Sequence, residues 1–267
     1  MRSYRRKRMV NYKQITYRYL KGQRKRTLLT ILGIILSAAM VSAIGTIIAS
    51  VRESLIKDAI RRNGSYHACF EDISIESLER IANHVDVKEY GVSSYQGCGL
   101  VGSIKEEEKE LYDSRYLNRY LNIVSYSEKA LGMLPYKIKE GRFPDTSNEI
   151  AIEYWMADYF KNNVNLGDII KLDIGESIYD KEGYEVKFDK KGEKEYKVVG
   201  FIEPGYVWKG NMVTAGIAGV DKENGTISGN KNSGYSIYVK LYSIKNAEDK
   251  INAIANDIGL DNENIKY

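Results

Sequence analysis

Histidine, cysteine and proline are scarce in this chain of 267 residues, which holds two histidines, two cysteines and three prolines. Two cysteines exclude a scaffold held by many disulfides and a zinc site with four cysteine ligands. Two histidines leave little for histidine-based catalysis or metal binding. The sequence also lacks a phosphate-binding loop and a serine nucleophile motif. We therefore expect no catalytic, cofactor-binding or metal-binding residue, and no enzymatic activity in this chain.

The few side chains suited to chemistry have simpler structural interpretations. His67 and Cys69 fall on one face of a predicted strand, but no second pair follows at metal-ligand spacing. Cys69 and Cys98 could form a disulfide if their strands are neighbours, and the sequence leaves this open. The acidic run Glu106–Glu108 is typical of a solvated helix start, with a cation site as the alternative. Most of the 22 tyrosines should be sheet and core residues, and an exposed cluster around Tyr112, Tyr116 and Tyr120 that contacts a partner is the alternative for these three.

Acidic residues are missing from the first 52 positions. This stretch holds 12 Lys/Arg and no Asp or Glu, whereas the other 215 residues hold 28 Lys/Arg against 36 Asp/Glu. The net charge of +4 therefore hides a basic first part and an acidic remainder, which belong in different surroundings. The mean basicity is no indication of nucleic-acid binding, and we expect no nucleic-acid partner.

An uncharged run of 25 residues, from Thr27 to Val51, ends the basic part. As a helix it is about 37 Å long, against a hydrocarbon core of about 30 Å. Positive charge before the run places the N-terminus in the cytoplasm and residues after about 52 outside the cell. The run predicts a transmembrane helix over residues 27–51, in the plasma membrane. A cleaved signal peptide is the alternative, but its apolar region of about 7–15 residues is shorter.

The segments on either side of this span continue helical patterns. Residues 52–64 predict a stalk helix between the span and an outer domain, or else an ordinary solvated helix end. Residues 1–26 form a basic segment, in which we favour an interfacial amphipathic helix over a disordered tail. That helix carries Tyr12, Ile15 and Tyr19 on one face and Arg18 elsewhere, and we expect these four residues to contact lipid or a cytoplasmic subunit.

Small residues recur at helical spacing within the span. Such residues let a second helix approach closely, which favours helix association in lipid. The alternative is that small residues are simply common in spans. The predicted helix-packing residues are Gly33, Ser37, Ser42, Gly45 and Thr46.

Residues 65–267 predict a mixed α+β domain outside the membrane. Strand–helix–strand patterns near 65–95 and 235–267 predict a split βαβ core, and residues from about 105 to 225 predict a β-rich insert. Separate strands are expected at 87–95 and 99–104. Within the insert we expect helices over 106–120 and 125–134, and a hairpin that pairs 184–188 with 196–202.

Two groups of residues carry a family resemblance. The opening NYKQITYRYLKGQRKRTLLTILGIILSAAM resembles the start of FtsX-like, or MacB-like, ABC transporter permeases. Four later segments keep the order seen in the extracytoplasmic domain of that family: residues 141–144, 148–152, 166–168 and 196–201. Their glycines permit tight turns, and Arg142 could pair with Glu149 or remain solvated. The motif residues with expected structural roles are Gly141, Arg142, Pro144, Glu149, Gly167, Asp168 and Gly200.

The resemblance implies a permease component that works as a dimer with a separate cytoplasmic ABC ATPase. The outer domain would contact a substrate or partner, or relay movement. Implied partners are that ATPase, the lipid bilayer, and the remaining permease spans or a second permease chain. Because three more spans follow the outer domain in such permeases, the chain is interpreted as truncated, split or a one-span relative. The alternative function is a signal-anchored extracellular binding or sensor protein without transport activity.

Overall fold

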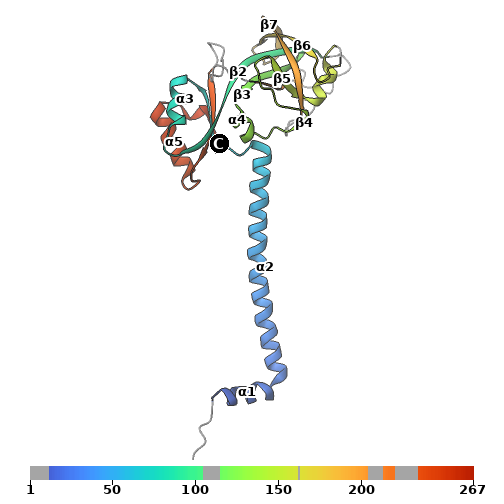
Figure 1. Ribbon diagram of the computed structural model, residues 1–267. Coiled ribbons are helices and arrows are strands. Elements are labelled where there is room, and N and C mark those ends of the chain that lie inside the picture. Colours follow the sequence, from blue (N-terminus) through green and yellow to red (C-terminus); the bar gives the residue numbers. More distant parts are fainter. Residues whose placement is uncertain (1–11, 105–114, 162, 204–212, 220–233) are drawn as a thin grey trace, which may run out of the picture. The chain divides into compact units, whose positions relative to one another are not determined.

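The computed structural model describes residues 12–104, 115–161, 163–203, 213–219 and 234–267 (Figure 1). The chain divides into two compact units, Met1–Asp58 and Ala59–Tyr267. The first unit is helical and the second holds all ten strands of the described residues. This is the α+β class expected from the sequence, with an apolar helix near the N-terminus and a β-rich domain after it.

The N-terminal unit is built from two helices, α1 (Tyr12–Gly22) and α2 (Arg24–Asn63). Helix α2 has 40 residues, and an 18-residue window within it reaches a mean hydropathy of 2.4. Its length and composition are sufficient to cross a membrane. The predicted span and stalk therefore form one uninterrupted helix, because nothing between them breaks the backbone hydrogen bonding.

The first and last parts of the second unit make an α/β half. Its elements are β1 (Ala68–Ile73), α3 (Ile75–Ala82), β2 (Val87–Ser103), β9 (Tyr235–Leu241), α5 (Ala247–Ile258) and β10 (Ile265–Lys266). The strand order is β10-β1-β9-β2, with antiparallel neighbours. Strand β9 thus lies between β1 and β2, and β1 lies between β9 and β10. The predicted split βαβ core is confirmed.

Local sequence signals explain the two helices of this half. Ser74 caps α3 by accepting a hydrogen bond from the Ser77 amide over 3.1 Å. Helix α5 ends at Gly259, whose φ of 69° is the left-handed conformation that glycine adopts readily. Their apolar faces pack on the sheet around Phe70 and Ile81, both fully buried.

The middle of the chain makes a barrel half. Its elements are β3 (Asn118–Tyr126), α4 (Glu128–Met133), β4 (Ile138–Gly141), β5 (Glu149–Glu153), β6 (Ile169–Tyr179), β7 (Glu185–Ile202) and β8 (Val213–Ala218), with the 3₁₀ helices η2 (Tyr154–Tyr159) here and η3 (Asn262–Asn264) before β10. Successive pairings β2-β3-β8-β5-β7-β6 return to β2, so six strands close a ring. Strand β4 pairs with β7 outside the ring. Apolar side chains such as Ile123, Ile152 and Leu172 fill the interior.

Strand β2 belongs to both halves. Its first part pairs with β9, and its later part pairs with β3 and β6. The prediction of two separate strands, at 87–95 and 99–104, is therefore wrong. Gly97, with a φ of 126°, lies where the register of β2 against β3 shifts, and the bulge lets one strand serve two sheets.

Two other expectations about the middle of the chain are also wrong. Segments 184–188 and 196–202 do not pair with each other, because β7 runs as one strand from Glu185 to Ile202, and its residues 185–197 pair with β6. Gly192 lies between these two segments, where a turn would be needed, but it stands opposite Ile174 in the β6–β7 ladder. The expected helix over 106–120 lies partly outside the described residues, yet its end belongs to β3, where Tyr120 is fully buried. The short helix expected over 125–134 begins later, at Glu128.

Candidate functional site

The family-motif residues converge around one end of β7. Gly141 of β4 stands opposite Gly200 of β7 in the antiparallel ladder. A Cβ atom on Gly141 would lie 2.3 Å from the Val199 oxygen, and one on Gly200 would lie 2.2 Å from the Arg142 oxygen. Gly141 also has a φ of 79°. Only glycine fits both positions, because the two backbones approach more closely than a side chain allows.

Arg142 and Glu149 form an ion pair beside this contact. The Arg142 guanidinium donates to both Glu149 oxygens, over 2.9 Å and 2.5 Å, and to Asp145 Oδ2 over 3.0 Å. The Asp145 amide donates to Glu149 Oε2 over 2.9 Å. The Arg142 hydrogen bonds hold the pKa of Glu149 below its ordinary value. The sequence left open whether Arg142 pairs with Glu149 or stays solvated, and in the structure the two side chains are paired.

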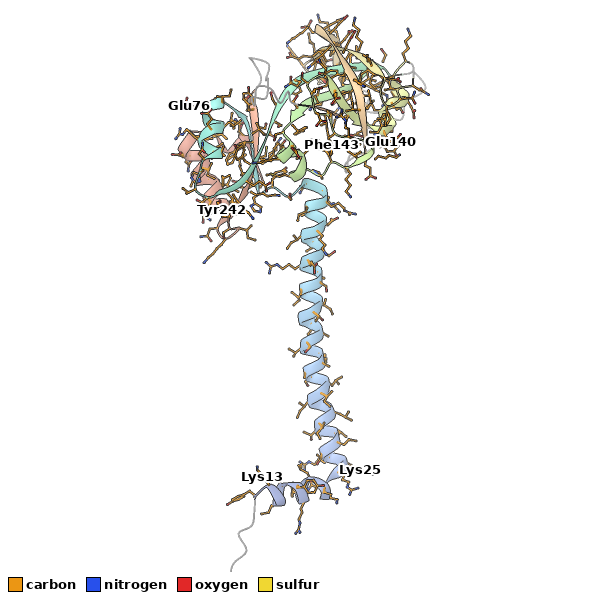
Figure 2. All side chains as sticks on the ribbon, in the orientation of Figure 1. Lys13, Lys25, Glu76, Glu140, Phe143 and Tyr242 are labelled. Carbon is orange, nitrogen blue, oxygen red and sulfur yellow. The ribbon has the colours of Figure 1, made fainter. Side chains whose placement is uncertain are left out.

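The Leu166-Gly167-Asp168 turn closes the same cluster. The Gly167 amide donates to the Val198 oxygen over 2.8 Å, and the Val198 amide donates to the Asp168 oxygen over 2.9 Å. Asp168 Oδ2 accepts from the Asn165 amide over 2.8 Å, and Gly167 has a φ of 93°. Pro144 is buried beside the Arg142 loop, on the segment that Glu140 and Phe143 mark in Figure 2. These contacts fix backbone turns, so the motif residues hold β4, β5 and β7 together.

The residues predicted to contact lipid or a cytoplasmic subunit lie on α1, which Lys13 marks in Figure 2. Tyr12 is 86% exposed, Ile15 is 50% exposed and Tyr19 is 65% exposed. Arg18 is exposed as well. Helix α1 therefore forms where the amphipathic pattern predicts it, and these apolar and aromatic side chains lie open on its surface.

The predicted helix-packing residues lie on α2. Ser37 Oγ donates to the Gly33 oxygen over 2.9 Å, and Thr46 Oγ1 donates to the Ala43 oxygen over 2.8 Å. A Cβ atom on Gly33 or Gly45 would meet no other atom within 4 Å. Ser42 is exposed like its neighbours. Packing of this face against another helix stays a prediction.

A junction that the sequence did not indicate holds the residues after α2. The Ser65 amide donates to the oxygen of Met133, the last residue of α4, over 2.6 Å. Gly64 has a φ of 103°, and a Cβ atom on it would lie 2.4 Å from the same Met133 oxygen. Helix α4 in turn lies against β2, where a Cβ atom on Gly91 would be 2.4 Å from the Ala130 Cα. Ser65, α4 and β2 are thus in contact within the β-rich unit.

A pocket of about 160 Å³ lies on the outer side of β3 and β8. The rings of Tyr126 and Tyr136 are 5.8 Å apart, and their hydroxyls are 3.5 Å apart. Burial raises the pKa values of both phenols, so both stay protonated at neutral pH. No sequence motif marks this pocket, because its walls come from separated segments: Asn122, Val124, Tyr126, Tyr136, Thr214, Ala215 and Gly216.

The side chains that suggested chemistry have structural roles. His67 Nδ1 accepts from the Leu241 amide over 2.9 Å. Cys69 and Cys98 are free thiols, and burial raises the pKa of each to about 12, which disfavours the reactive thiolate. Within the described ranges, no group of three His, Cys, Asp or Glu side chains could hold a metal ion. The run at 106–108 lies outside those ranges.

The expected exposed tyrosine cluster is corrected in part. Tyr120 is fully buried and donates its hydroxyl to Glu185, so it cannot contact a partner. Tyr116 is half-buried and packs edge-on against Tyr179, with ring centroids 6.3 Å apart. Tyr112 lies outside the described residues.

Comparisons with known proteins give one family. A sequence model of the MacB-like periplasmic core domain matches residues 27–256. Among solved structures, the periplasmic region of MacB from Actinobacillus actinomycetemcomitans is similar, with 10% identity, a TM-score of 0.45, and coverage of 80% of this chain and 92% of that chain. The extracellular domain of the ABC-type transporter YknZ from Gram-positive bacteria has 12% identity, a TM-score of 0.42, and coverage of 74% and 97%. No match was found among curated proteins.

Proposed function

Because the chain belongs to the MacB-like periplasmic core domain family, we propose that it is a permease component of an ABC transporter. In this proposal, residues 27–51 span the plasma membrane and the β-rich unit stands outside the cell. ATP is bound and hydrolysed by a separate cytoplasmic subunit. The β-rich unit relays movement between the membrane helix and an extracellular substrate or partner.

The observation that carries this proposal is the family match, which covers the predicted span and most of the β-rich unit together, over residues 27–256. Helix α2 runs without a break to Asn63, and the Ser65 amide two residues later donates to the Met133 oxygen within the β-rich unit.

Helix α1 supplies the surface for the cytoplasmic partner in this proposal. Its basic residues attract anionic lipid, at about 1 kcal/mol per residue near the surface, and salt weakens this attraction. Specific docking depends instead on apolar and aromatic side chains, and Ile15 and Tyr19 are two of the exposed ones on α1, beside Tyr12, Tyr17 and Leu20.

Co-purification at high salt tests the proposal. The full chain is tagged and expressed with the ABC ATPase encoded beside its gene, and with the remaining permease spans or second permease chain when these are encoded separately. We expect the ATPase to be recovered with the chain. Ile15→Asp should reduce recovery by about tenfold, the equivalent of about 1.4 kcal/mol, whereas Lys13→Gln should leave it nearly unchanged. Absence of the ATPase from the wild-type assembly would favour the anchored sensor or binding protein.

A further inference from the structure

The pocket beside Tyr126 has the size of one chemical group and not of a whole substrate. Its volume is about 160 Å³, or about five water molecules at about 30 Å³ each. It lies on the outer side of the ring, since Leu121 and Ile123 of β3 point into the core while Asn122 between them is exposed. A ligand that fills it therefore places one small group inside and leaves the rest of its mass in solvent.

The pocket walls favour a positively charged group. Tyr126 and Tyr136 contribute two aromatic rings tilted by 59°, and aromatic faces attract ammonium groups. The two phenol oxygens and the Asn122 amide supply hydrogen-bond acceptors to the same space. No lysine or arginine is among the seven residues that line it.

A buried carboxylate lies behind this wall. Glu153 is 5% exposed, and its carboxylate accepts from the Trp155 indole N–H over 2.6 Å and from the backbone N–H of Ala215, a lining residue. Both donors are neutral groups, so they satisfy its oxygens without cancelling its charge. The bond from Ala215 places this carboxylate directly behind the pocket wall, and while burial raises the pKa of Glu153, the bonds from Trp155 and Ala215 lower it.

We propose that this pocket binds an alkylammonium group, such as a lysine-type side chain of an extracellular peptide. The ammonium lies among the phenol oxygens and the Asn122 amide, and the alkyl stem lies along Val124 and the tyrosine rings. The pocket would then supply part of the substrate contact of the permease. This role, unlike the binding itself, rests on the proposed function. Binding itself does not depend on the ATPase, so the two proposals fail independently.

Peptide titration of the full chain in lipid nanodiscs tests this assignment. The probes are the capped tripeptide Gly-Lys-Gly and its norleucine counterpart, which keeps the stem and lacks the charge. We expect the lysine peptide to bind at least about tenfold more tightly. Equal affinity of the two peptides, or no binding of the lysine peptide, would overturn the proposal.

Two variants locate the binding and guard against misfolding. Glu153→Gln removes the buried charge, and Asn122→Lys places a competing cation on an exposed residue of the wall. Each should weaken lysine-peptide binding by about tenfold or more, whereas Glu140→Gln, at an exposed carboxylate of β4, should not. If Glu153→Gln does not fold, the affinity of Asn122→Lys for the lysine peptide is the deciding measurement. An unchanged affinity in that variant refutes the site.

A third probe identifies the source of the ammonium group. Butylammonium carries the same charge and stem without a peptide. Competition by butylammonium at concentrations similar to those of the peptide supports a small free amine as ligand. Much weaker competition supports the peptide side chain, because the peptide then gains from contacts outside the pocket. No competition at any concentration places the peptide elsewhere and contradicts the proposal.

Discussion

The Arg142 guanidinium and the Glu149 carboxylate form a two-pronged ion pair, with Nη1 donating to Oε2 over 2.9 Å and Nη2 donating to Oε1 over 2.5 Å. Glu149 precedes Ile150 of the barrel core, whereas Arg142 follows the outer strand β4. The pair therefore ties a peripheral strand to the ring. It is the one motif contact in which charge, and not backbone shape, connects two segments of the cluster.

Glu149→Gln tests how much this pair stabilises the β-rich unit. The side chain of Glu149 is 15% exposed, so solvent screens the pair less than an open surface pair. We expect a loss of about 1–2 kcal/mol in the free energy of unfolding, since Arg142 and the Asp145 amide lose a charged acceptor. Urea unfolding of the chain in detergent measures it, and Glu140→Gln on exposed β4 is the control. Equal midpoints for the two variants would contradict the assigned role.

The same pair predicts acid sensitivity. The folded-state pKa of Glu149 is lowered from its ordinary value of 4.5, so its stabilising effect is complete above that value and is lost as the pH falls through the folded pKa. The destabilisation caused by Glu149→Gln should therefore shrink as the pH falls below 4.5. A destabilisation that stays constant down to pH about 2 would show that charge is not its cause.

Gly141→Ala tests the close approach of β4 and β7. The new methyl group would meet the Val199 oxygen at 2.3 Å, on a backbone with a φ of 79°. We expect a loss of at least about 2 kcal/mol, from strain and displacement together. Gly192→Ala on β7, where a Cβ atom meets nothing within 4 Å, should change stability by less than about 0.5 kcal/mol. Similar unfolding midpoints for both variants would argue against this close approach.

His67 predicts a second pH dependence near neutrality. Burial, helped by the nearby Lys240 charge, lowers its pKa from the ordinary value of 6.5, and its Nδ1 must be unprotonated to accept from Leu241. The unfolded chain therefore takes up the proton first as the pH falls, and stability decreases from about pH 6.5 downward. Melting temperatures measured between pH 8 and pH 5 should fall less in His67→Asn, whose side-chain oxygen accepts without titrating. An identical fall in both proteins would exclude His67 as the cause.

Membrane orientation is tested by thiol labelling of intact cells. Starting from a chain with Cys69→Ala and Cys98→Ala, Lys181→Cys in the exposed turn between β6 and β7 should react with a membrane-impermeant reagent. Lys7→Cys, before the apolar helix, should react only after the cells are opened. The charge split around that helix is the physical reason. The reverse labelling pattern would require the N-terminus to lie outside.

Local patterns predicted the elements that depend on neighbours in sequence. Helices α3 and α5 lie within the two strand–helix–strand patterns near 65–95 and 235–267, from which the split βαβ core was predicted. The motif glycines were also assigned structural roles before their contacts were known. These signals are reliable because capping, turns and face periodicity act over a few residues.

Contacts between distant segments were beyond that reasoning. Ser65 and Met133 are 68 residues apart, and Asn122 stands beside Ala215 in the pocket wall only through the parallel pairing of β3 with β8. The sequence predicted two strands where β7 is one, because a glycine such as Gly192 is typical of a turn. Pairing with β6 keeps the backbone extended there. Pairing partners and pocket walls depend on topology, which a single sequence does not specify.

The sharing of β2 between two halves sets an order in which the chain can fold as it leaves the ribosome. The partners of β1 are β9 and β10, and β9 begins more than 160 residues after β1 ends. At about 5–20 residues per second, β1 waits roughly 10–30 s for its neighbours. The later part of β2 meets β3 and β6 well before that. The barrel half can thus form first and present the free edge of β2 as a template, and the last strands made complete the sheet on which α3 and α5 rest.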